Sequence, residues 1–171
     1  MRMIMLVIGI LCMFAQVAEA REPFGVPVRS YDGELRGLRD ELRRSAEIQK
    51  IADKLRGLKG LALLGWVNQS VQMSSVIGTD NLCTTKTLAK CEVLRLVDPR
   101  LQCRPVEGTT RASVLRAGIL ETHLMATVQL GAVWHVLDNR HIVYGYYTPT
   151  DKEVAAFSGT RKFNAFRSYK E

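Results

Sequence analysis

The chain has 171 residues, of which 47% are hydrophobic and 24% are charged. This balance is typical of a globular protein and excludes a disordered, collagen-like or low-complexity chain. Its 24 lysines and arginines exceed its 17 aspartates and glutamates, which gives a net charge of +7. That charge favours anionic surfaces, but it is well short of a histone-like excess.

The first twenty residues have the pattern of an export signal. Arg2 precedes an apolar run over residues 3–17, and an Ala-Glu-Ala sequence ends at Ala20. The run of about 15 apolar residues is shorter than the roughly 20 that cross a bilayer. We therefore expect a signal peptide over 1–20 and one periplasmic or secreted domain over 21–171, without a transmembrane segment after signal cleavage.

The cysteines of the mature chain are odd in number. Cleavage removes Cys12 and leaves Cys83, Cys91 and Cys103 in an oxidising compartment. One unpaired thiol or an intermolecular bond is therefore expected. A pair between Cys83 and Cys103 would leave Cys91 free, but another pair, or three packing residues, fits the sequence equally well.

The first half of the mature chain has helical character. Residues 21–33 hold two prolines and two glycines and are expected to form an extended leader. A helix is predicted from about Glu34, with two apolar stripes displaced by roughly 150°, which requires a break near Ser45. A second helix is predicted around residues 64–71. The charges in this region alternate in sign and few aromatic residues accompany them, so we expect a solvated surface and no nucleic-acid partner.

The second half of the chain has strand character. The pattern over residues 78–111 is weak and permits either a short buried helix or a strand. After Arg111 the sequence indicates a series of strands separated by glycine or asparagine. Helices followed by strands predict an α+β domain, with the N-terminal helices packed on a C-terminal antiparallel sheet. The predicted strands cover residues 112–119, 122–130, 132–138 and 141–147.

Two of these strands form a predicted hairpin with a two-residue type II′ turn that begins at Gly131. In this register Leu130 faces Val133, and His123 and Asp138 become diagonal neighbours on one face. That face is the more polar one and is expected to line a cleft. The opposite, apolar face is expected to belong to the core.

A histidine beside a carboxylate has a recognised chemical use. The carboxylate fixes the imidazole tautomer, and the other ring nitrogen can then serve a nucleophile. A cysteine gains greatly from such a partner, because the thiolate is its reactive form. The candidate catalytic residues are Cys91, His123 and Asp138, although His123 also fits a hydrogen-bonded surface histidine. We expect His135 in the core and His141 on the surface.

The segment ETHLMATVQLGAVWHVLDN resembles the histidine and aspartate segment of the bacterial transglutaminase-like cysteine peptidases, H-A-V-x-A-x-x-x-G-x-W-x-V-L-D-N. GWVNQSVQMSSVIGTD and EPFGVPVRSYDGELRGL are similar to two further segments of that family. The order cysteine, histidine, aspartate is also the same. The resemblance implies a papain-like fold, with the cysteine at the start of a helix packed on an antiparallel sheet that carries the histidine and the aspartate.

Under this resemblance, His123 and Asp138 match the catalytic histidine and aspartate, and Asn139 matches the asparagine that follows. Around the nucleophile the family has G-D-C-E-D-Y-A, of which only Cys91 and Glu92 are retained here.

The two aspartates of that family motif are replaced by Lys90 and Val93. Some members bind calcium through these acidic residues, and calcium needs six to eight oxygen ligands, several of them carboxylates. We therefore expect no calcium, no other metal and no cofactor in this chain.

The resemblance implies an exported cysteine peptidase that acts on a protein substrate, such as a surface adhesin, under an inner-membrane regulatory receptor. One alternative is a catalytically degenerate relative that serves as a periplasmic binding or adaptor protein, because the residues around Cys91 differ from the family's. Another, which rests on the charge of +7 alone, is a basic module on anionic envelope polymers.

Overall fold

The computed structural model describes residues 28–77, 83–110, 122–138, 141–146 and 163–170. Among these residues a short strand comes first, four helices follow it, and five strands come last. The elements are β1 (Val28–Ser30), α1 (Gly33–Arg44), α2 (Ala46–Leu55), α3 (Gly60–Met73), α4 (Cys83–Val97), β2 (Gln102–Thr110), β3 (Thr122–Leu130), β4 (Val133–Asp138), β5 (His141–Tyr146) and β6 (Phe163–Lys170).

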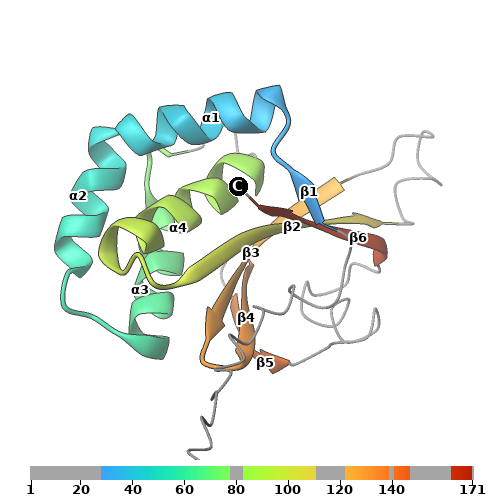
Figure 1. The fold of residues 1–171 in the computed structure, drawn as a ribbon. Coiled ribbons are helices and arrows are strands. Elements are labelled where there is room, and N and C mark those ends of the chain that lie inside the picture. Colours follow the sequence, from blue (N-terminus) through green and yellow to red (C-terminus); the bar gives the residue numbers. More distant parts are fainter. Residues whose placement is uncertain (1–27, 78–82, 111–121, 139–140, 147–162, 171) are drawn as a thin grey trace, which may run out of the picture.

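The strands form one sheet in the order β1-β6-β2-β3-β4-β5, and the four helices gather on one side of it (Figure 1). Helix α4 contacts the other three helices and strands β2 and β3. The predicted α+β class is therefore confirmed. The sheet differs from the expected C-terminal antiparallel one, because β1 from the leader joins its edge and runs parallel to β6.

The predicted break at Ser45 is confirmed. Helix α1 begins after Asp32, whose side-chain oxygen accepts a hydrogen bond from the Leu35 N–H at 2.9 Å, which satisfies one free donor of the first turn. Ser45 has extended backbone angles, ends α1 and precedes α2. Two short helices with different directions allow each apolar stripe to face the core. The predicted second helix is α3.

Helix α4 occupies the segment whose pattern was too weak to assign. Residues 87–94 are all buried, so the helix lacks the polar face from which helical periodicity is recognised. Its end is marked in the sequence, because Pro99 follows two residues after Val97 and cannot continue a helix. The long burial makes α4 the centre of the helical layer.

The predicted hairpin is confirmed as β3 and β4. Gly131 has a φ of 60°, as the first central residue of a type II′ turn requires, and Leu130 pairs with Val133. The predicted strand over residues 112–119 lies outside the described residues. Strand β6 was not predicted at all.

The apolar core lies between the helices and the hairpin face that was expected to point inward. It includes Leu63, Leu64 and Val67 of α3, Leu88, Val93 and Leu94 of α4, and Leu124, Ala126, Val128 and Leu137 of the hairpin.

The other hairpin face is not the polar cleft wall that was expected. Met125, Thr127, Trp134 and Val136 on that face are at most 2% exposed. The turn at Gly131 therefore predicted the register correctly, whereas the polar residues of this face did not predict its exposure.

Candidate active site

Cys83 is the first residue of α4 and carries a partly buried free thiol. The N-terminus of a helix has unpaired N–H groups and the positive end of the helix dipole, and both favour a negative charge there. Because α4 is fifteen residues long, its N-terminus has both of these properties. The position suits a thiolate better than any other along the helix.

His123 and Asp138 lie on the adjacent strands β3 and β4 and are hydrogen-bonded to each other. The distance from His123 Nε2 to Asp138 Oδ1 is 2.6 Å, and the two residues are only 3% and 5% exposed. The predicted pairing of these side chains is therefore confirmed. Because Asp138 engages Nε2, the other ring nitrogen, Nδ1, is left for a different partner.

The His123 side chain is also hydrogen-bonded to the thiol of Cys83, and the charges of the two groups act on each other. The backbone N–H of Leu124 and the side chain of Thr84 also hydrogen-bond to the thiol. Cys83, His123 and Asp138 thus form a continuous chain of contacts that joins the start of α4 to two neighbouring strands. Nucleophile, base and orienting carboxylate have this order in cysteine hydrolases.

The contacts shift the pKa values of both the thiol and the imidazole. Burial alone would raise the pKa of Cys83, but the hydrogen bonds from His123, Leu124 and Thr84 and the charge on His123 outweigh burial and lower it. Burial alone would lower the pKa of His123, but Asp138 and Cys83 raise it to about 9. Both shifts therefore act in favour of a thiolate beside an imidazolium.

The structure corrects the prediction that Cys91 is the nucleophile. The sulfur of Cys91 is bonded to that of Cys103 on β2, with 5.3 Å between the two Cα atoms. A sulfur held in a disulfide has no thiolate with which to attack. Cys91 also lies eight residues along α4 from Cys83, about 12 Å along the helix axis, so it is not at the helix start.

The sequence contained a signal that could have identified Cys83. The resemblance requires the cysteine at the start of a helix, whereas Pro99 lies only eight residues after Cys91. A helix long enough to span the sheet had to begin well before Cys91. Cys83 is the cysteine at that place.

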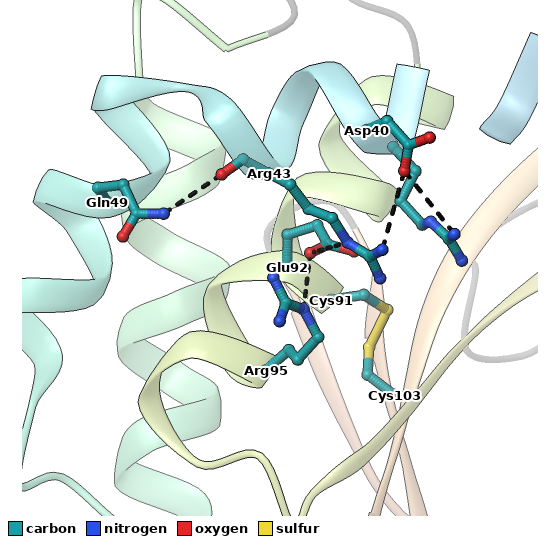
Figure 2. A network of polar contacts seen from close by, with 8 residues as sticks. Asp40, Arg43, Gln49, Cys91, Glu92, Arg95 and Cys103 are labelled. Carbon is teal, nitrogen blue, oxygen red and sulfur yellow. Dashed lines mark hydrogen bonds and ion pairs between the residues drawn. A yellow bond between two sulfur atoms is a disulfide. The ribbon is translucent and has the colours of Figure 1, made fainter. Parts of the chain in front are cut away.

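The C-terminal half of α4 holds a second polar cluster around the buried Glu92, which Figure 2 shows together with the disulfide. Arg43 Nε and Arg95 Nε each lie 2.9 Å from the same oxygen of Glu92, Oε2. A cavity of about 250 Å³ borders the disulfide and this carboxylate. None of its lining residues belongs to the Cys83 site, so this cavity is not the substrate cleft of that site.

Of the two other histidines, the structure describes only the side chain of His135. His135 is buried, as predicted, and burial lowers its pKa. His141 lies on β5, but its side chain is outside the described ones.

Among the described residues, no three or more histidine, cysteine, aspartate or glutamate side chains are grouped as metal ligands would be. No helix in that part of the chain has both the length and the apolar character of a membrane span. The predicted signal peptide over 1–20 lies outside the described residues.

Comparisons with family models, curated proteins and solved structures give no match for this chain.

Proposed function

We propose that this protein is an exported cysteine peptidase of the transglutaminase-like type, with Cys83 as nucleophile, His123 as proton carrier and Asp138 as orienting residue. The observation that carries the proposal is the chain of contacts from the Cys83 thiol through the His123 imidazole to Asp138, 2.6 Å from the ring. Cys83 lies at a helix N-terminus beside an imidazole, and His123 lies beside a carboxylate that orients it.

The reaction begins from the thiolate–imidazolium pair. The Cys83 thiolate attacks a peptide carbonyl, and His123 gives its proton to the leaving amine as the C–N bond breaks, which leaves an acyl thioester. Water then attacks the thioester, with its proton taken by His123. The C–S bond breaks, the acid leaves, and Cys83 returns to the thiolate. Asp138 keeps the imidazole oriented throughout.

A papain-like arrangement is part of this proposal. The family resemblance implies a cysteine at the start of a helix and a histidine and aspartate on the sheet against which that helix packs. Cys83 at the start of α4, with His123 on β3 and Asp138 on β4, fits that description. Cys91, inside the helix, does not.

The substrate and the setting of the reaction rest on the resemblance. It points to a protein substrate such as a surface adhesin, to a periplasmic or secreted location, and to an inner-membrane receptor as regulator. The proposed chemistry uses the side chains of this chain alone, without calcium or a cofactor.

A second candidate is a degenerate relative that binds a periplasmic partner without cleaving it. One observation favours this alternative. The family motif continues from its cysteine with Glu, Asp and Tyr, whereas Cys83 is followed by Thr84, Thr85 and Lys86. This divergence leaves the nucleophile in place but changes its immediate surroundings.

The experiment that separates the two candidates is iodoacetamide alkylation of the mature protein between pH 5 and 10, with labelled cysteines identified by mass spectrometry. We expect fast labelling of Cys83 well below pH 8 and loss of this fast labelling in His123→Ala. Incubation with exported adhesins, read by the appearance of new N-termini, then tests for cleavage.

Slow labelling of Cys83 with the pH profile of an ordinary thiol would overturn the proposed activity. Fast labelling without cleavage of any exported protein would favour the binding protein. Cys91 and Cys103 serve as internal controls, because they are expected to be labelled only after reduction.

A further inference from the structure

The face of α4 that begins with Cys83 carries two further polar side chains. Thr87 and Lys90 follow Cys83 by four and seven residues, and this spacing places all three on the same side of a helix. Both side chains are buried, at 2% exposure each. A buried polar face on a helix that packs against a sheet needs partners from that sheet.

Each of these side chains donates a hydrogen bond to a backbone carbonyl next to a site residue. Thr87 Oγ1 donates to the carbonyl of Leu124, which follows His123, at 2.9 Å. Lys90 Nζ donates to the carbonyl of Leu137, which precedes Asp138, at 3.4 Å. The helix that carries the thiol is therefore attached to both strands directly beside His123 and Asp138.

The ammonium group of Lys90 is expensive to keep at this place. Burial lowers the pKa of Lys90 to about 8, although the charges of Asp138 on β4 and Cys83 on its own helix act in the opposite direction; the charge of Lys86 adds to the lowering. An unfolded lysine titrates near 10.4, so the buried charge opposes folding fully below pH 8, and this cost is lost gradually as the pH rises from about 8 to about 10.4. An apolar residue of the same size would avoid the cost.

The charge of Lys90 balances the charges of the site in its reactive form. With the thiolate formed, Cys83 and Asp138 each carry −1, while His123 and Lys90 each carry +1, so the cluster is neutral. Without the lysine, the same form carries −1, and the unreactive thiol form, in which His123 is still protonated, is the neutral one. In a buried place of low effective dielectric the neutral form is favoured.

On this basis we propose that Lys90 is a positioning residue of the Cys83 site, whose buried ammonium provides the counter-charge for the reactive thiolate and holds the backbone next to Asp138. The inference rests on the proposed function in taking Cys83 as the nucleophile. It adds a residue from the buried face of α4 that the reaction itself does not touch.

The test compares the alkylation rate of Cys83 as a function of pH in the wild type, Lys90→Met and Lys90→Arg. The quantity compared is the position of the acid limb, which is the pH range over which the rate rises as the thiol loses its proton. We expect Lys90→Met to move the limb upward by about one pH unit, so that labelling near pH 6 slows by about tenfold. Lys90→Arg keeps the charge and should keep the limb in place. The comparison is made below pH 8, where Lys90 is charged.

Lys86→Met is the matched control. It removes the same charge from the same helix, one turn nearer to Cys83, but Lys86 is only partly buried and donates to the Gln72 carbonyl at 3.0 Å. We expect it to move the limb much less than Lys90→Met. Methionine has nearly the volume of lysine and no charge to bury, so Lys90→Met should fold, as circular dichroism would verify.

An unmoved acid limb in folded Lys90→Met would overturn the role of Lys90, as would an equal shift in folded Lys90→Arg. If the arginine variant fails to fold, a shift in Lys90→Met no larger than that in Lys86→Met overturns it instead. The expected shift in a protein that cleaves no peptide would support the role of Lys90 and overturn only the proposed peptidase activity. The two failures are therefore distinguishable.

Discussion

The two halves of α4 put cysteine and charge to different uses. At its N-terminus, Cys83 is a free thiol beside a histidine whose pKa is raised to about 9. Two turns later, Cys91 is fixed to β2 by a disulfide, next to a buried glutamate held by two arginines. One helix thus carries a titratable cluster at one end and a cross-linked cluster at the other.

The difference shows that the chemistry of a cysteine depends on its partner rather than on the residues beside it in sequence. Of the family's motif around the nucleophile, the comparison retained only Cys91 and the Glu92 that follows it. In the folded protein that glutamate binds Arg43 and Arg95 and serves packing between α1 and α4 (Figure 2). The acidic neighbour therefore belongs to the structural end of the helix.

The largest expected effect separates the two cysteine sites by activity. Cys83→Ala should reduce peptide hydrolysis by about a thousandfold or more, because the nucleophile is lost. The double variant Cys91→Ala/Cys103→Ala should retain activity within about threefold once folded, since neither sulfur reaches the reacting groups. Initial rates on a cleaved substrate measure both. Equal losses in the two variants would contradict the assignment of the sites.

The dependence of the hydrolysis rate on pH should be set only by the groups at the Cys83 end of α4. Hydrolysis needs the thiolate and the imidazolium together, so the rate should fall as the pH rises through about 9, where His123 loses its proton. On the acid side it should fall only below the ordinary thiol range, because the pKa of Cys83 is lowered. His123→Ala should lower the rate by about a hundredfold or more and abolish the basic limb. A wild-type profile that keeps rising to pH 10 would contradict the ion pair.

Removal of the disulfide should mainly affect stability. Cys91 and Cys103 are 12 residues apart, and closing a loop of this length restricts the unfolded chain by about 3 kcal/mol. Urea unfolding of Cys91→Ala/Cys103→Ala should show a loss of this size in the free energy of unfolding. Cys83 alkylation at pH 6 in the folded variant is the control. A large change in that rate would mean that the disulfide also positions the reactive end.

The smallest expected effect concerns the Glu92 cluster. Glu92→Gln removes the charge that Arg43 and Arg95 share, but both arginine side chains are partly exposed, at 27% and 44%, and can be hydrated. We expect a loss of about 1–2 kcal/mol in urea unfolding, with no change in Cys83 alkylation. A loss much above this would show that the two arginines are trapped without water.

The features that the sequence predicted correctly depend on short-range patterns. The break at Ser45 follows from two apolar stripes that one helix cannot point in one direction. The pairing of His123 with Asp138 follows from the turn at Gly131, because a two-residue turn fixes every later pair in the hairpin. These are consequences of local geometry, and no distant segment can alter them without breaking the hairpin.

The features that only the tertiary structure decided depend on contacts between distant segments. The sequence alone determined an α+β chain with a histidine and an aspartate side by side. It did not determine which cysteine meets them, because α4 is buried on nearly every side and so lacks the periodicity that marks a helix. Thr87 and Lys90 bond to carbonyls 37 and 47 residues away. The packing of α4 on the sheet decides which partner each cysteine sulfur meets. It also decides the burial of Lys90.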